Sequence, residues 1–146
     1  MKTVFGASVL VICLSAVYGL VDVKEFSPKL LALTKSLHTT CLAQSGCNEA
    51  QIALMKAGNL KNPTVSEKKY VSCLWTSSGL LNSKLETNRA LLEELMPASI
   101  ASTETPIYLT CIEETKKQVQ LTVLDDQCWF LMNCIHDASP GNFIMF

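Results

Sequence analysis

The sequence predicts an all-α fold of about six helices that are stapled together by disulfide bonds. Helix-start signals recur along the chain, and each precedes a segment in which apolar residues repeat every three or four positions. No stretch shows the alternation of apolar and polar residues that is typical of a half-buried strand. Six of the seven cysteines lie beyond the first segment. An even, dispersed set of this kind is typical of disulfides in a small exported domain.

The first segment, residues 1–19, has the features of a secretory signal peptide. Lys2 precedes an apolar run over residues 4–17, and Gly19 is the small residue near the cleavage point. The run is shorter than the roughly 18 to 20 apolar residues that span a bilayer, so we expect a cleaved signal and not a membrane anchor. The mature protein is therefore expected to be secreted, with residues 20–146 forming one helical domain.

Charge and motifs exclude several classes of protein. The chain has 12 basic and 13 acidic residues, which are dispersed, so it lacks the basic stripe of a nucleic-acid-binding protein. No CxxC pair occurs, and His38 and His136 have no partners at the spacing of metal ligands. No GxSxG or HExxH motif of a hydrolase is present. We therefore expect a protein without a cofactor that is not an enzyme.

Three helices are predicted in the first half of the mature chain. Ser27 precedes a proline, so its side chain can cap free amides while the proline takes the first helical position. Thr64 and Glu67 have the spacing of a capping box. A glycine stops each helix at its far end. The expected helices span residues 27–46, 48–58 and 64–79.

Three more helices are predicted in the second half. Ser83 has capping-box spacing to Glu86 and begins the fourth helix. Thr105, followed by a proline, begins the fifth, and Asp125 or Asp126 caps the sixth. The sixth is apolar almost all the way round, which is typical of a helix buried in the middle of a domain.

The last two cysteines constrain the pairing by their spacing. Cys128 and Cys134 are six residues apart on one predicted helix, roughly 9 Å at 1.5 Å per residue. That exceeds the limit of about 7 Å between the Cα atoms of a disulfide, so they cannot pair with each other. They are expected to staple the last helix to two different neighbours.

The cysteine pattern, placed on these helices, resembles the insect odorant-binding protein family in its reduced-cysteine branch. Residues 41–47, CLAQSGC, are similar to that family's first cysteine and the glycine turn that follows it. Residues 69–74, KYVSCL, are similar to its second and third cysteines, with lysine in the second position. Cys111 and Cys134, followed by a proline and a phenylalanine, are similar to its fourth and sixth cysteines and closing tail. The resemblance covers nearly the whole mature chain.

The resemblance implies how the matching cysteines pair. The family joins its first cysteine to the third and its fourth to the sixth, which implies Cys41 to Cys73 and Cys111 to Cys134. Its second and fifth cysteines pair with each other, and this chain lacks both, because Asp125 stands in the fifth position. The two losses are therefore consistent with each other.

Cys47 and Cys128 have no counterpart in the family framework. We expect them to form a replacement bridge between the second and the last helix. Two free thiols are one alternative, and Cys128 acting as a shifted fifth cysteine is another.

The resemblance implies six helices around an apolar cavity that carries odorants, pheromones or other lipophilic molecules through lymph or glandular fluid. Methionine and aromatic side chains suit such a site because they adapt to a ligand and orient it. Tyr108 or Thr115 is expected to supply a polar anchor. Ordinary core packing is the competing explanation for each lining residue taken alone. The candidate lining residues are Ile52, Met55, Leu74, Trp75, Leu92, Met96, Tyr108, Ile112, Trp129, Phe130, Met132 and Phe143.

The expected partner is a small hydrophobic ligand, with a membrane receptor as a second candidate, and the expected state is a monomer or weak homodimer. Residues 143–146 form an apolar tail, which is interpreted either as a lid over the cavity or as a docked or frayed end. His136 lies beside Asp137 just before this tail, so its protonation is a candidate trigger for release, and a solvated histidine is the alternative.

Two other functions stay open from the sequence. A saposin-like, lipid-interacting protein is also helical with six cysteines, but it pairs cysteines near both termini. Here the first mature cysteine, Cys41, lies more than 20 residues into the mature chain. A secreted helical signalling or interaction protein with a solid core is the third candidate.

Overall fold

The computed structural model describes residues 21–145 of the 146-residue chain, so the predicted signal peptide over residues 1–19 lies outside the described part. Within that part the fold is helical, and the one β-type pairing is an isolated bridge between Leu81 and Thr87. The helices are η1 (Val23–Glu25), α1 (Pro28–Ser45), α2 (Glu49–Lys56), α3 (Val65–Ser77), α4 (Arg89–Leu95), α5 (Ala101–Lys116), α6 (Leu124–Ala138) and η2 (Pro140–Asn142). The predicted all-α class is confirmed.

The first three helices begin where the sequence places their caps. The Ser27 hydroxyl accepts a hydrogen bond from the Leu30 amide at 3.1 Å, and Pro28 occupies the first turn of α1. Asn48 and Thr64 each form a complete capping box at the start of α2 and α3. Gly46 ends α1 with a φ of 72°, a conformation that glycine adopts without steric cost.

The predicted start of the fourth helix at Ser83 is wrong. The Asn82 side-chain oxygen accepts hydrogen bonds from the amides of Lys84 and Glu86, which closes a turn instead of a helix. Leu85 has a φ of 58°, outside the helical region. α4 therefore begins only at Arg89, capped by the side chain of the preceding asparagine.

The predicted starts of the last two helices are also displaced. α5 begins at Ala101, so Pro106 lies inside the helix, where it removes one backbone hydrogen bond. α6 begins at Leu124, and neither Asp125 nor Asp126 caps it. Both aspartates lie in its first turn and bind α3 instead: Asp125 accepts from the Ser72 hydroxyl, and Asp126 pairs with a lysine of α3.

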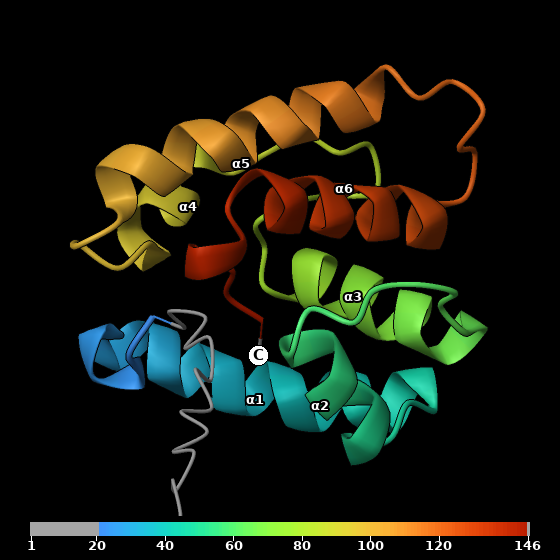
Figure 1. The fold of residues 1–146 in the computed structure, drawn as a ribbon, viewed down its shortest axis with the longest axis horizontal. Helices are drawn as coiled ribbons and strands as arrows, with labels where there is room; N and C mark the ends of the chain where they lie inside the picture. Colours follow the sequence, from blue (N-terminus) through green and yellow to red (C-terminus); the bar gives the residue numbers. More distant parts are fainter. Residues whose placement is uncertain (1–20, 146) are drawn as a thin grey trace, which may run out of the picture.

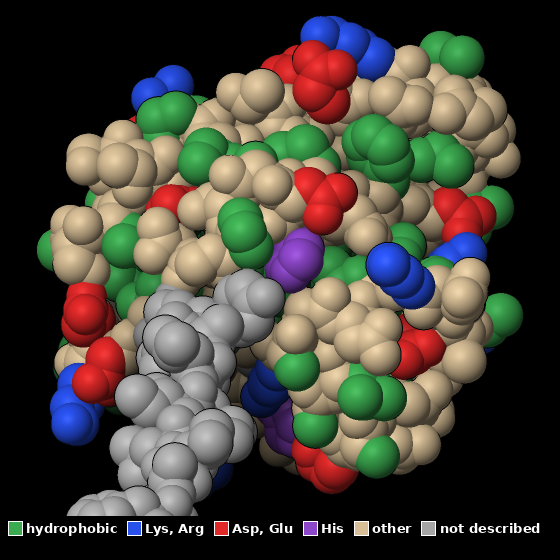
Figure 2. All heavy atoms as spheres, in the orientation of Figure 1, with side chains coloured by type: hydrophobic (Ala, Val, Ile, Leu, Met, Phe, Trp, Pro, Cys, Tyr) green, Lys and Arg blue, Asp and Glu red, His purple; other side chains and the backbone are tan. Residues whose placement is uncertain are grey.

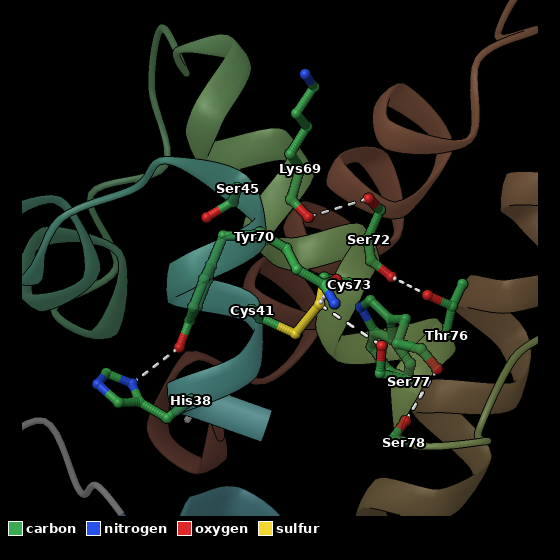
Figure 3. The surroundings of a disulfide bond; sticks show 12 residues. His38, Cys41, Ser45, Lys69, Tyr70, Ser72, Cys73, Thr76, Ser77 and Ser78 are labelled. Carbon is green, nitrogen blue, oxygen red and sulfur yellow. Dashed lines mark hydrogen bonds between the residues drawn. A yellow bond between two sulfur atoms is a disulfide. The ribbon is translucent and has the colours of Figure 1, made fainter. Parts of the chain in front are cut away.

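The four long helices stack in the order α1, α3, α6, α5 (Figure 1). The disulfide Cys41–Cys73 joins α1 to α3, and Cys111–Cys134 joins α5 to α6. Both pairings that the resemblance implied are confirmed. The Cys41–Cys73 bridge lies between the two facing helices, beside a 3.0 Å hydrogen bond between the Tyr70 hydroxyl and Nδ1 of His38 (Figure 3).

The expected replacement bridge between Cys47 and Cys128 is wrong, because both residues are free thiols. Cys47 follows α1 and lies near Tyr70 on the side of α3 that packs on α1. Cys128 lies on α6, which packs on the opposite side of α3. The body of α3 therefore separates the two sulfur atoms, and of the stated alternatives the free thiols are correct.

Both free thiols are buried in the described fold. Cys47 is 7 % exposed and Cys128 is 0 % exposed. Burial, reinforced by the nearby Asp125 carboxylate, raises the pKa of Cys128 to about 12. Burial likewise raises the pKa of Cys47. Thiolate is the reactive form of cysteine, so both side chains behave as small apolar core residues.

Candidate ligand-binding site

An apolar cavity of about 40 Å³ lies where α4, the beginning of α1, α5 and the C-terminal tail meet. In Figure 1 these segments gather around α4. Every lining side chain except the tyrosine is purely apolar. The lining residues are Leu30, Leu80, Leu92, Leu95, Met96, Pro97, Tyr108 and Ile144.

The helix pattern explains one wall of the cavity. Leu92 and Leu95 are three residues apart, so they share the inward face of α4, and both are buried. Met96 ends that helix in an extended conformation and turns Pro97 toward the same space. Tyr108 faces them from the buried side of α5. α4 and the two residues that follow it thus present four side chains to one cavity.

The C-terminal tail forms another wall. Residues 139–145 leave α6 through η2 and return against the core. Phe143 is 5 % exposed and packs edge-on against the His136 ring, with ring centroids 5.1 Å apart. Ile144 then reaches the cavity. Of the two interpretations of the tail, the structure shows the docked arrangement; whether the tail moves as a lid stays a prediction.

The cavity in this structure is small for a ligand. A cavity needs roughly 10 to 15 Å³ of water-accessible space to hold one water molecule, and this one offers about 40 Å³. Small-molecule sites are usually about 300 to 1,000 Å³. A lipophilic guest therefore fits only if lining side chains or the tail move outward.

The structure places the predicted lining residues in different surroundings. Leu92, Met96 and Tyr108 line the cavity, and their contact with a ligand stays a prediction. Trp75 is partly buried and packs against Tyr108, with ring centroids 6.1 Å apart. The others that are buried lie in the hydrophobic core and do not line this cavity: Ile52, Met55, Leu74, Ile112, Trp129, Met132 and Phe143.

Phe130 lies away from the cavity. With Trp129 and Leu121 it lines a shallow surface hollow of about 360 Å³ beside the Lys68–Asp126 ion pair. The near-uniform apolar character of α6 obscured this difference, because the sequence does not reveal which side of an all-round apolar helix is left uncovered.

The two candidate polar anchors differ in availability. Thr115 is buried, and its hydroxyl donates to the Cys111 carbonyl oxygen at 2.7 Å, so it is already used within α5. Tyr108 lines the cavity, and its hydroxyl has no hydrogen-bond partner among the described residues. Burial, reinforced by the Glu104 carboxylate, raises the pKa of Tyr108, so the phenol stays neutral at physiological pH. Of the two, only Tyr108 has its hydroxyl available at the cavity, and its role as an anchor stays a prediction.

His136 lies at the base of the tail. Its Nδ1 is 3.3 Å from the carboxylate of Asp137, which is exposed. On the other side its ring meets Gly58, where a Cβ atom would come within 2.5 Å of Nε2. The histidine thus packs between the end of α2 and Phe143 of the tail. A role in pH-dependent release stays a prediction.

Sequence reasoning missed five of the lining residues: Leu30, Leu80, Leu95, Pro97 and Ile144. Leu95 carried a usable signal, because it lies three residues after Leu92 on the same helical face. Ile144 belongs to the apolar tail that the sequence had marked as unusual. No sequence signal marked Leu30 and Leu80, since only the tertiary fold brings their segments to α4.

The surface and the described side chains add three findings. Acidic and basic side chains are interspersed over the face shown in Figure 2, with hydrophobic side chains between them. From residue 21 to residue 145, no helix has the length and apolar character required to cross a bilayer. The same range contains no cluster of three or more His, Cys, Asp or Glu side chains arranged to hold a metal ion.

Comparison with known proteins identifies one relationship. The family model described as PBP/GOBP family matches residues 23–138, which is most of the chain. Neither a search of curated proteins nor a search of solved structures found a match. The matched range contains both disulfides and all six α-helices of the described fold. The chain therefore belongs to the PBP/GOBP family, the family of insect odorant-binding proteins.

Proposed function

We propose that this protein is a secreted carrier that binds a small hydrophobic molecule, such as an odorant, a pheromone or another lipophilic compound, and transports it through lymph or glandular fluid. Proteins of this family are carriers of small ligands. The same membership supports a binding role without catalysis. Export through cleavage of residues 1–19 is part of the proposal, and N-terminal sequencing of the exported protein tests it.

One observation supports this function most strongly: part of the wall of the apolar cavity is a segment that no helix or disulfide holds in place. Ile144 follows η2, and neither a regular helix nor a disulfide holds residues 143–145. Met96 adds an unbranched side chain that adapts to irregular shapes. Outward movement of these two residues would enlarge the cavity without unstacking α1, α3, α6 and α5.

The driving force for binding is the removal of apolar surface from water. Each buried CH₂ group contributes about 0.8 kcal/mol, so a chain of about ten carbons gains about 8 kcal/mol. That gain corresponds to a Kd near 1 μM before the cost of moving the tail is subtracted. Lipophilic ligands of this length are therefore expected to bind in the micromolar range.

Displacement of an anilinonaphthalene fluorophore by dodecanol tests the proposal. The protein should take up the probe, and dodecanol should displace it at micromolar concentration. Ile144→Ala should bind more tightly, because less side chain must leave the cavity, and Ile144→Trp should bind more weakly. Leu54→Ala is the matched control, since Leu54 is 52 % exposed on α2.

Absence of probe uptake by the folded protein would overturn the carrier function. Equal affinities in both Ile144 variants would place the ligand elsewhere.

A further inference from the structure

Glu104 is a buried carboxylate on α5, and it is only 2 % exposed. Its Oε1 accepts hydrogen bonds from the Ser139 hydroxyl at 2.9 Å and from the Asn142 side-chain amide at 2.8 Å, with a weaker contact to the Thr103 hydroxyl at 3.5 Å. Its Oε2 is buried and has no hydrogen-bond partner anywhere in residues 21–145. Burial of a polar oxygen without a partner is costly, so this atom requires an explanation.

The bonds of Oε1 have a clear structural role. Ser139 precedes η2 and Asn142 is its last residue, so Glu104 connects α5 to the segment that leads into the tail. Two residues after Asn142, Ile144 lines the cavity. These bonds use only one of the two carboxylate oxygens, and they leave the second oxygen unexplained.

Two residues that line the cavity are close to Glu104 in the fold. Tyr108 follows it by one helical turn on the same buried face of α5 and lines the cavity. Ile144 approaches from the tail that Glu104 holds. The Glu104 carboxylate also acts electrostatically on the Tyr108 hydroxyl, raising the pKa of that phenol. The unpaired Oε2 of Glu104 therefore lies close to a phenol that lines the cavity. Glu104 itself does not line the cavity, so a ligand reaches Oε2 only when the cavity enlarges.

We propose that Glu104 Oε2 and the Tyr108 hydroxyl together bind the hydroxyl group of an apolar alcohol, and so select alcohols over hydrocarbons and esters of the same chain length. This inference rests on the proposed carrier function. The ligand O–H donates to Oε2, and its oxygen accepts from the phenol. A hydrocarbon or an ester has no donor, so its binding leaves the buried oxygen unsatisfied.

Competition against the same fluorophore with three matched ligands tests this selection. Dodecanol should bind at least about tenfold more tightly than dodecane or dodecyl acetate, since a hydrogen bond to a charged group accounts for a factor of that order. Glu104→Gln keeps an oxygen for Ser139 and Asn142 and turns the other atom into a donor. Its preference for dodecanol should fall to less than about threefold, while its affinity for dodecanal, a pure acceptor, should rise.

Two further variants distinguish the selection of alcohols from the role of Glu104 in holding the C-terminal tail. Tyr108→Phe should weaken dodecanol binding and leave dodecane binding unchanged. The double variant Ser139→Ala/Asn142→Ala loosens the tail but keeps Oε2 as an acceptor, so all ligands should change by the same factor and the preference for alcohol should remain.

Equal affinities of the unmodified protein for the three ligands would overturn the inference. An equal loss of affinity for all three ligands in Glu104→Gln would overturn it as well. Those outcomes leave the carrier function intact, because the ligands still bind. Failure of the probe and of every ligand would instead overturn the carrier function, and the selection with it.

Discussion

Two disulfides join the four stacked helices α1, α3, α5 and α6, which we call the bridged core. Residues 80–97 and 139–145, which we call the unbridged end, carry no disulfide and contain only one seven-residue α-helix. The bridged core is filled by fully buried side chains such as Leu131 and Met55. The unbridged end leaves a cavity. The comparison indicates that this fold concentrates its stability in one region and its adaptability in the other.

The hydrogen bonding of buried polar groups also differs between the two regions. In the bridged core, the buried Thr115 hydroxyl donates to a carbonyl oxygen of its own helix, and the Tyr70 hydroxyl shares a hydrogen bond with His38 of the neighbouring helix. Next to the unbridged end, Glu104 keeps one oxygen without a partner. A region that binds a ligand is expected to contain such unsatisfied groups, because the ligand completes them.

Removal of a disulfide from the bridged core should have the largest effect on stability. The double variant Cys41→Ala/Cys73→Ala should lower the free energy of unfolding by about 3 to 4 kcal/mol, since the bridge closes a loop between residues separated by 32 positions. Urea unfolding followed by circular dichroism measures the change. A loss below about 1 kcal/mol would mean that the helix stack does not depend on this bridge.

Truncation of one leucine in each region should show the difference in packing. Leu131→Ala, in the bridged core, should lower the free energy of unfolding by about 3 kcal/mol. Leu131 is 0 % exposed, and the surrounding helices cannot close the space that its side chain leaves. Leu95→Ala should cost about half as much, because that side chain already faces a cavity and makes fewer contacts. Urea unfolding of both variants gives the comparison, and equal costs would contradict it.

Alkaline pH should destabilise the bridged core through Cys128. Its thiol has a pKa of about 12 in the folded protein, against an ordinary value of 9.0. Between these values the unfolded chain loses the thiol proton and the folded chain keeps it, so stability falls as pH rises. The slope is at most about 1.4 kcal/mol per pH unit. Cys128→Ala should lack this component when unfolding is measured from pH 8 to pH 11, and parallel curves for the two proteins would contradict the burial of the thiol.

Two glycines provide a smaller test at the contact between α2 and the base of the tail. Gly58→Ala should cost about 1 to 2 kcal/mol, from the positive φ of 79° and from the collision of its Cβ with His136. Gly46→Ala is the matched control, with a φ of 72° and open space around the Cβ position, and should cost about 1 kcal/mol. Thermal unfolding of both variants measures the difference. If Gly58→Ala and Gly46→Ala lower the melting temperature equally, the His136 ring moves freely and does not anchor the tail.

Sequence patterns predicted the bridged core better than the unbridged end. The caps Ser27, Asn48 and Thr64 act over three residues, so local chemistry alone locates the helices they begin. Ser83 has the same local pattern, but Asn82 competes for the backbone amides and closes a turn. The pairing of the cysteines followed from a family framework, and Cys47 and Cys128, which lie outside that framework, were paired wrongly.

The site was only partly predictable, because helical periodicity does not separate core from cavity. Met96 and Met132 have similar apolar surroundings in the sequence, but one lines the cavity and the other is core. Glu104 resembles a solvent-facing residue in the sequence, and only the return of the tail buries it. Contacts between residues far apart in the chain decide both cases.

Methionine methyl groups offer the most direct test of where the ligand binds. With ¹³C-methyl methionine, the described part of the chain provides four probes: Met96 in the cavity, Met145 in the tail, and Met55 and Met132 in the bridged core. On addition of dodecanol, we expect the Met96 signal to shift and to show nuclear Overhauser contacts with the ligand chain, while the Met55 and Met132 signals stay in place. Ligand contacts at Met132 with an unchanged Met96 signal would contradict a binding site at the unbridged end.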